Sequence, residues 1–243
     1  MNYKLEISYN GKNYCGYQIQ PNLTTVQGEL EKALTTIFNE PIKTTASGRT
    51  DAMVSALKQV VNFYSNTKIS EYSLLCRLNL TLPADIRVNK VEYVDDEFNA
   101  RFSAKKKTYS YNFYINRINN PYLDDFCYKV SYKLDMKKFE DELNSLVGTF
   151  DFTSLSSTDT QTENKVRTIY SVNLKQEQNV YTVTICGNGF LKNMIRIIMG
   201  TLFDISRGKI KKSIVEVIND KNRASAGKTA GAVGLVLVDV NYD

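Results

Sequence analysis

The chain contains no histidine among its 243 residues, and this absence removes several kinds of active site at once. Ser-His-Asp and Cys-His catalysis need an imidazole, as do His-ligated metal centres and any site that uses histidine as its general base. Whatever chemistry the protein performs must therefore come from carboxylates, lysines, tyrosines or thiols.

Cysteines and long apolar runs are also scarce. The four cysteines, at positions 15, 76, 127 and 186, lie far apart, so no CxxC pair exists for a metal or for redox chemistry, and there is no disulfide framework. The first residues do not resemble a secretory signal, and the apolar stretches fall short of the about 18 residues that span a membrane. The sequence predicts a soluble, cytoplasmic protein with reduced thiols and no membrane partner.

The spacing of apolar residues predicts a mixture of strands and helices, since period two indicates a strand and steps of three and four indicate a helix. Strands are expected over residues 3–9, 54–64, 86–94, 108–115, 166–174, 180–186 and 235–242. Helices are expected after a capping box at Thr24 and Gln27, and over residues 72–80, 135–147, 190–205 and 212–218. This mixture favours an α+β fold with helices packed against a broad, mostly antiparallel sheet.

The length allows one large domain or two compact halves, at roughly 100 to 200 residues per domain. The expected elements form two sets of similar content, and the crossover near residues 97–104 separates them. We therefore expect an N-terminal half over residues 1–100 and a C-terminal half over residues 101–243.

Positive charge is unevenly spread along the chain. Residues 101–138 and residues 189–228 each hold nine basic and three acidic side chains, whereas the whole chain has 31 basic and 26 acidic residues. Such a basic side favours contact with the phosphates of a nucleic acid. Charge alone leaves a second interpretation open, in which lysine is merely the default solvated residue.

The first candidate site is a glycine-containing turn that carries Arg49 and Asp51, just before the expected strand of residues 54–64. If the segment is extended, both side chains project from the same side, so the guanidinium can keep the carboxylate ionised and aimed. In a chain without histidine, such a carboxylate is a candidate nucleophile. The alternative is an ordinary turn whose Arg49 pairs with Asp51 on the surface.

The second candidate is the strand that follows three consecutive lysines at positions 105–107. Alternation places Tyr109, Tyr111 and Phe113 on the face that carries the first and third of these lysines. Cations on the backbone and a ring stacked on a base, at about 1 to 3 kcal/mol, hold single-stranded or flipped nucleotides in this way. For Tyr111 and Phe113 the pattern favours a place in the core, whereas Tyr109 remains open.

The third candidate is Arg196, in the expected helix of residues 190–205. Helical periodicity gives this helix an apolar stripe and places Arg196 on the opposite side with Lys192 and Arg207. Two interpretations remain open: an ordinary exposed arginine, or a cation that pairs with a carboxylate or a phosphate at the site.

Many short motifs along the chain together resemble one enzyme family. They occur in this order: Tyr9-Asn10-Gly11, Tyr14-Cys15-Gly16-Tyr17-Gln18, Thr25-Val26-Gln27-Gly28, Gly48-Arg49-Thr50-Asp51-Ala52, Leu82-Pro83-Ala84-Asp85, Phe98-Asn99-Ala100-Arg101-Phe102, Thr108-Tyr109-x-Tyr111, Gly148-x-x-Asp151-Phe152, Phe190-Leu191-x-x-Met194-Ile195-Arg196 and Val233-Gly234-Leu235-x-Leu237. This series covers nearly the whole chain and resembles the TruA-type tRNA pseudouridine synthases.

The resemblance implies an enzyme that isomerises uridine to pseudouridine at tRNA positions 38 to 40, in the anticodon stem and loop, without cofactor or metal. It implies the fold of that family, with two similar halves and a cleft between them, and a homodimer. Matched position by position, Asp51 is the expected nucleophile, Arg49 its partner and a contact for the flipped nucleotide, Tyr109 the ring against the target base, and Arg196 an ion-pair partner of Asp51.

The chain departs from the usual family pattern at a few positions. Met53 and Ser55 stand where the family usually has glycine and histidine, Phe150 replaces a customary histidine, and Gly231 lies where proline is usual. These changes bear on RNA contacts and hence on which uridines are modified. Two other functions therefore stay open: modification of other RNA uridines by a paralogue, and RNA binding without catalysis.

Overall fold

The computed structural model describes residues 1–159 and 162–243 of the chain. Contacts among these residues divide it into two compact units, one made of Met1–Lys105 with Val236–Asp243 and the other of Lys106–Leu235. The grouping differs from the expected halves because the closing segment of the chain belongs with the first unit. The division into domains at residue 100 stays a prediction.

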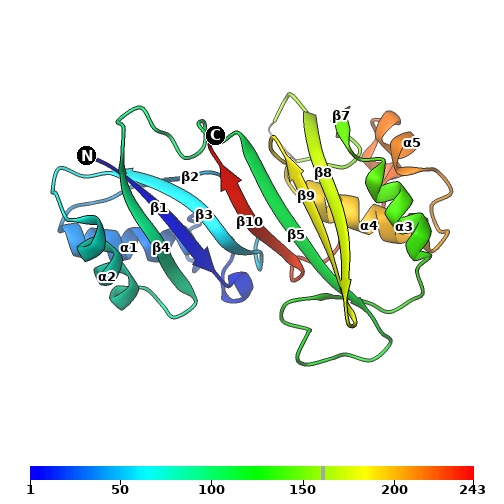
Figure 1. The fold of residues 1–243 in the computed structure, drawn as a ribbon, viewed down its shortest axis with the longest axis horizontal. Coiled ribbons are helices and arrows are strands. Elements are labelled where there is room, and N and C mark those ends of the chain that lie inside the picture. Colours follow the sequence, from blue (N-terminus) through cyan, green and yellow to red (C-terminus); the bar gives the residue numbers. More distant parts are fainter. Residues whose placement is uncertain (160–161) are drawn as a thin grey trace. The chain divides into compact units, whose positions relative to one another are not determined.

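The strands of the first unit are built around β1 (Asn2–Tyr9), which pairs antiparallel with both β3 (Ser55–Tyr64) and β4 (Ile86–Val94). The short strand β2 (Thr44–Ala46) is antiparallel to β3, and β10 (Leu235–Asn241) is parallel to β3. The strand order within this unit is therefore β4-β1-β3-β10 (Figure 1).

Two helices belong to the first unit, α1 (Val26–Phe38) and α2 (Glu71–Thr81), and α1 crosses behind the strands in Figure 1. The side chain of Thr25 accepts a hydrogen bond from the amide of Gly28 and caps α1. The capping residue predicted at Thr24 was thus wrong by one position. A helix N-terminus needs such an acceptor because its first amides have no partner within the helix.

The core of the first unit follows from the period-two pattern of β1. Tyr3, Leu5 and Ile7 are fully buried, while the residues between them are only partly covered. The ring of Tyr3 stacks on that of Phe63 in β3, with centroids 5.0 Å apart, and meets the edge of Phe38 at the end of α1. This aromatic contact joins the helix layer to the strands.

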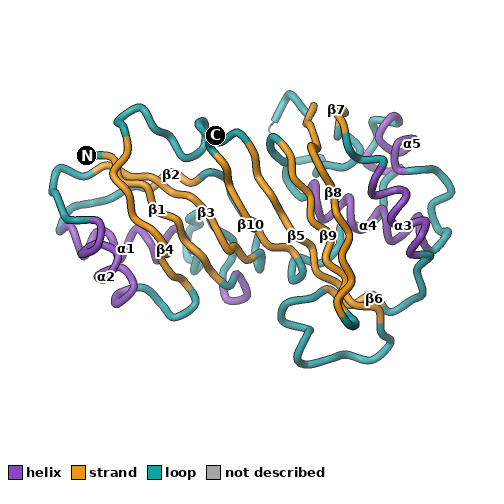
Figure 2. Tube along the Cα trace, in the orientation of Figure 1, coloured by secondary structure: helices purple, strands orange, loops and turns teal. Residues whose placement is uncertain are grey.

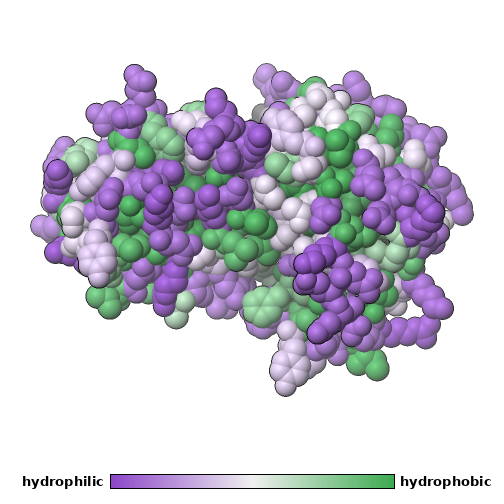
Figure 3. All heavy atoms as spheres, in the orientation of Figure 1, coloured by the Kyte–Doolittle hydropathy of each residue, from purple (hydrophilic) through white to green (hydrophobic). Residues whose placement is uncertain are grey.

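The opposite face of these strands carries many polar side chains, and hydrophilic residues are interspersed with apolar ones on the side seen in Figure 3. Ion pairs run between neighbouring strands, from Lys4 to Glu92 at 3.1 Å and from Lys58 to Asp239 at 2.8 Å. Such partly exposed pairs contribute at most about 1 kcal/mol each. The alternation of the sequence therefore matches one covered and one solvated face.

The main strands of the second unit are antiparallel. β5 (Lys106–Ile115) pairs with β9 (Val180–Gly187), and β9 pairs with β8 (Val166–Glu177). Beyond it β8 pairs with β7 (Gly148–Asp151). The short strand β6 (Tyr128–Val130) is parallel to β5 (Figure 2).

The described part of the second unit also contains the helices α3 (Met136–Asn144), α4 (Met194–Ser206) and α5 (Ile214–Asn219). α3 and α4 pack together, and the rings of Phe139 and Phe203 from these helices meet Phe113 of β5 at centroid distances of 5.6 and 5.1 Å. All three rings are buried. The interpretation of Phe113 as a core residue is confirmed, and Tyr111 is equally buried.

The expected helix of residues 190–205 differs from α4 in two ways. α4 begins at Met194, because Asn193 adopts a left-handed conformation with φ 59° and ends any continuous helix there. Every residue of α4 except Arg196 is buried, so the helix has no exposed polar side. Lys192 and Arg207, expected opposite the apolar stripe, lie outside the helix.

The α+β class and the mostly antiparallel pairing are confirmed. The sequence patterns missed three short strands (β2, β6 and β7) and two 3-10 turns, η1 (Gly11–Asn13) and η2 (Arg223–Ser225). Strands of three or four residues are too short for a periodic signal. No helix in the described part of the chain has both the length and the apolar composition of a membrane span.

Candidate functional site

Asp51 lies in the loop that joins β2 to β3, and the start of this loop is fixed by one buried glutamine. The amide of Ser47 donates to the carbonyl of Val60 at 2.8 Å, which continues the β2–β3 pairing. The hydroxyl of Ser47 donates to Oε1 of Gln59 at 2.6 Å, while Nε2 of Gln59 donates to the carbonyl of Gly48 at 2.9 Å. Because Ser47 and Gln59 are fully buried, these bonds set the direction in which the chain leaves β2.

The loop then turns sharply at Asp51. The amide of Val54 donates to the carbonyl of Asp51 at 3.2 Å, and Met53 at the third turn position has φ 66°. This is the position of a type II turn at which glycine is preferred, so Met53 occupies a conformation that side chains disfavour. Asp51 is half-buried at the first position of the turn.

A second segment, residues 9–17, holds the same loop from outside. The amide of Tyr17 donates to the carbonyl of Thr50 at 3.0 Å, and the amide of Met53 donates to the carbonyl of Tyr14 at 3.2 Å. The hydroxyls of Tyr9 and Thr50 are hydrogen-bonded at 2.8 Å. The backbone is therefore tied down on both sides of Asp51, by residues about 35 to 40 positions earlier in the chain.

Gly11 shows how closely this outer segment approaches. A Cβ atom at Gly11 would lie 2.2 Å from the carbonyl oxygen of Val54, which leaves room only for glycine. The amide of Gly11 donates to Oγ of Ser55 at 3.0 Å, so the serine that replaces the family's usual histidine takes part in the contact. Tyr9 and Gly11 belong to one of the sequence motifs, but the sequence alone predicted no role for either residue.

Burial also affects the phenol of Tyr9. Its desolvation raises the pKa of Tyr9 to about 12, although the hydrogen bond with Thr50 acts in the opposite direction. Tyr9 is thus a neutral hydrogen-bonding group at physiological pH, and its contact with Thr50 does not depend on ionisation.

Arg49 is exposed in the same loop, two residues before Asp51. Both residues lie in the loop between β2 and β3 and not in a strand. The pairing of Arg49 with Asp51 stays a prediction.

Tyr109 lies on β5 of the second unit, opposite Ile185 of β9. Its ring meets the ring of Phe190 edge-on, at a centroid distance of 5.3 Å and an interplanar angle of 84°. Tyr109 is half-buried, whereas Tyr111 two residues further along the same face has no exposed surface. Tyr109 therefore lies at the boundary between the solvent-exposed and the buried part of this face of β5.

Arg196 is held in a fixed orientation at the first turn of α4. Its Nε donates to the carbonyl of Ala230 at 2.9 Å, and its Nη1 donates to Oδ1 of Asn193 at 2.8 Å. The amide of Ala230 in turn donates to the carbonyl of Arg196 at 3.0 Å. Because the side chain is half-buried and donates these two hydrogen bonds, the interpretation of Arg196 as an ordinary exposed residue is wrong.

The four predicted site residues fall in both units of the chain. The structure brings Arg49 and Asp51 into one loop of the first unit, and it places Tyr109 and Arg196 in the second. Among the residues that the structure describes, no three His, Cys, Asp or Glu side chains gather where they could hold a metal ion.

Comparison with known proteins identifies the chain's relatives. A family model described as tRNA pseudouridine synthase matches residues 7–103 and 143–243. A protein of Bacillus licheniformis named tRNA pseudouridine synthase A is 45% identical, over 100% of both chains. One of the same name from an Exiguobacterium species is 39% identical, over 99% of this chain and 97% of its own.

Solved structures give a much weaker likeness. A chain from the crystal structure of a Cbf5-Nop10-Gar1 complex is 9% identical, with a TM-score of 0.41. The match covers 97% of this chain and 58% of that one.

Proposed function

We propose, from the premise that the chain belongs to the tRNA pseudouridine synthase family, that it isomerises uridine to pseudouridine in the anticodon stem and loop of tRNA. The expected targets are positions 38, 39 and 40. The observation that supports this most strongly is the family match over the residues around Asp51, in a chain that has no histidine to serve as a base or nucleophile.

The reaction asks little of the protein beyond one nucleophile and a closed site. The bond from the ribose to N1 of uracil breaks, the base turns while still bound, and a bond from the ribose to C5 forms as C5 loses its proton. We assign the nucleophile to Asp51, whose carboxylate attacks either the ribose or the base and is released at the end. The target nucleotide must first leave its stack, as in other enzymes that act on a base.

The other proposed site residues bind and orient. Tyr109 places its half-buried ring against the target base, and the edge contact with Phe190 supports that ring. Arg196, oriented by Ala230 and Asn193, is the proposed ion-pair partner of Asp51. Arg49 is exposed, which suits the proposed contact with the flipped nucleotide.

The resemblance further suggests a homodimer that binds tRNA, located in the cytoplasm with its substrate. The basic segments over residues 101–138 and 189–228 support a polyanionic partner. Neither a cofactor nor a metal is needed for the proposed chemistry.

The substitution Asp51→Asn tests the proposed nucleophile. It keeps the size of the side chain and removes the attacking carboxylate, so we expect tRNA binding and folding to be retained while conversion falls by about 10⁴-fold or more. Conversion is measured as pseudouridine formed in a tRNA transcript by the purified protein. Asp96→Asn, an exposed acid of the same unit, is the matched control and should keep full activity.

Substantial turnover by Asp51→Asn would refute the assignment. A wild-type protein that binds tRNA tightly but forms no pseudouridine would instead favour the non-catalytic RNA-binding protein. Mapping pseudouridine in RNA from a strain that lacks the protein then identifies the uridines, and loss at sites outside positions 38 to 40 would indicate a paralogue with another target.

A further inference from the structure

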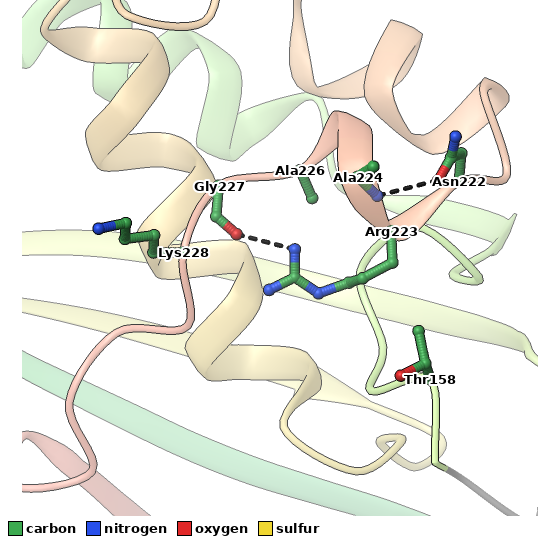
Figure 4. Close-up of a pocket in the computed structure, with 7 residues that line it drawn as sticks. All are labelled: Thr158, Asn222, Arg223, Ala224, Ala226, Gly227 and Lys228. Atoms are coloured by element: carbon green, nitrogen blue, oxygen red, sulfur yellow. Dashed lines mark hydrogen bonds between the residues drawn. The ribbon is translucent and has the colours of Figure 1, made fainter.

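The second unit has a surface pocket of about 500 Å³ that none of the proposed site residues lines. Its walls come mainly from the segment between α5 and β10, with one residue from the loop after β7 (Figure 4). The lining residues are Thr158, Asn222, Arg223, Ala224, Ala226, Gly227 and Lys228.

Arg223 is fixed within this pocket. Its Nη1 donates to the carbonyl of Gly227 at 2.9 Å and its Nη2 lies 3.3 Å from Oγ1 of Thr229. Oδ1 of Asn222 accepts from the amide of Ala224 at 2.9 Å and so caps η2, the turn that carries Arg223. A guanidinium has five N–H donors, so this one keeps donors for a ligand after both contacts are made.

The surroundings of the pocket leave its positive charge uncompensated. Lys228 is exposed and makes no ion pair with any described residue. The acids nearby in sequence are already engaged, since Asp159 pairs with Lys192 at 2.6 Å and Asp220 pairs with Lys212 at 2.6 Å. Two cations at one pocket without matching acids favour an anionic ligand.

The direction of the two cations indicates which kind of anion fits. Figure 4 shows the Arg223 side chain running toward Gly227, while the Lys228 side chain points away from it. Two groups that diverge do not close on one small ion, but they suit successive charges of a polymer. This geometry favours a phosphodiester backbone over a single free phosphate.

The pocket is also tied to the helix that carries Arg196. The amide of Gly227 donates to Oγ1 of Thr201, and a Cβ at Gly200 would lie 1.7 Å from the carbonyl oxygen of Lys228. Gly200 is one turn of α4 beyond Arg196, about 5 to 6 Å along the helix. Nucleic acid bound near Arg196 would therefore pass close to the pocket.

We propose that this pocket, through Arg223 and Lys228, binds backbone phosphates of the tRNA beside the target nucleotide. The proposal rests on the proposed function, because it takes tRNA as the polyanion. It adds a binding site whose residues play no part in the chemistry at Asp51.

The salt dependence of tRNA binding tests this pocket. The dissociation constant is measured over a series of KCl concentrations for wild type, Arg223→Gln, Lys228→Gln and the double variant. Each lost phosphate contact should lower the slope of log affinity against log salt by about 0.7 to 0.9, and weaken binding about threefold to tenfold near 0.1 M salt. Lys32→Gln, at an exposed lysine of α1 in the first unit, is the control for the charge change and should match wild type.

Lys228→Gln gives the decisive result if Arg223→Gln fails to fold, because the Lys228 ammonium makes no hydrogen bond or ion pair with a described residue and its loss should leave the fold intact. Lys228→Arg, which keeps the charge, should keep the slope. A Lys228→Gln slope equal to those of wild type and Lys32→Gln would overturn the proposal. A competition experiment with inorganic phosphate gives a second refuting outcome. If phosphate displaces tRNA more strongly than chloride at equal ionic strength, and this difference disappears in Arg223→Gln, the pocket is a free-phosphate site and the proposal is overturned.

Pseudouridine formation by wild type is measured alongside. If wild type forms pseudouridine and the salt slopes of the variants equal that of wild type, only the proposed phosphate site is refuted. If wild type forms no pseudouridine but the slopes fall in the variants, the proposed function is refuted and the phosphate site is retained. Failure of the wild type to bind tRNA would overturn both.

Discussion

Removing the hydroxyl of Tyr9 tests how the loop that carries Asp51 is held in place. Tyr9 and Thr50 are 4% and 7% exposed, and their hydroxyls are hydrogen-bonded at 2.8 Å. Tyr9→Phe leaves the hydroxyl of Thr50 buried without this partner, which costs about 1 to 3 kcal/mol. For a chain of this size, that corresponds to a Tm lowered by about 2 to 12 °C.

A double-mutant cycle separates this hydrogen bond from other effects of the substitution. Thr50→Val alone removes the Thr50 partner of the Tyr9 hydroxyl, which keeps its interaction with Gln59, and should cost a similar amount or less. The double variant removes both partners, and its loss should be smaller than the sum of the two single losses by about 1 kcal/mol or more. The free energies of unfolding come from urea titrations of all four proteins.

Activity gives a second readout of the same contact. Thr50 precedes Asp51, so loosening it should misplace the carboxylate and lower kcat about tenfold or more, with little change in KM for tRNA. Tyr64→Phe is the matched control, because Tyr64 is 53% exposed and its hydroxyl donates to the carbonyl of Asp96. We expect it to change stability by less than about 0.5 kcal/mol.

The cycle has a clear refuting outcome. Single-variant losses that add to within about 0.5 kcal/mol in the double variant would mean that the two hydroxyls do not stabilise each other. A Tyr9→Phe enzyme with wild-type kcat would show that Asp51 is positioned without this contact.

Two further predictions follow from the same region and from the buried tyrosines. Gly11→Ala places a Cβ against the carbonyl oxygen of Val54, so we expect the unfolding free energy to fall by about 1 to 3 kcal/mol and kcat to decrease. An unchanged midpoint in a urea titration would contradict the close approach. Burial raises the pKa of Tyr9 to about 12 from 10.0, so the unfolded chain ionises first as pH rises. The contribution of Tyr9 to stability should therefore be constant below about pH 10 and be lost between pH 10 and 12, by at most about 3 kcal/mol. A Tyr9→Phe variant whose urea titrations show an equally steep fall over this range would contradict this.

Local patterns predicted the long elements well, because each strand or helix repeats its period several times. The residues of β1 and the burial of Tyr111 and Phe113 follow from alternation, whereas β3 is a run of β-forming residues with five consecutive buried positions. The pattern failed at α4, where a helix that is apolar on nearly every side was interpreted as two-faced. Lys192, Arg196 and Arg207 together suggested an exposed side, but only Arg196 lies within α4, and its contacts with Asn193 and Ala230 allow it to be half-buried.

The sequence by itself determined which chemistry is available: with no histidine and with the family's ordered motifs, a carboxylate at Asp51 is the proposed reactive group. Only the tertiary structure decided how that residue is held, by Tyr9, Gly11 and Tyr17 on one side and Gln59 on the other. It also decided that Arg223 and Lys228 line one pocket. Residue identity and spacing are properties of the local chain, whereas contacts between segments tens of residues apart depend on how the whole chain packs.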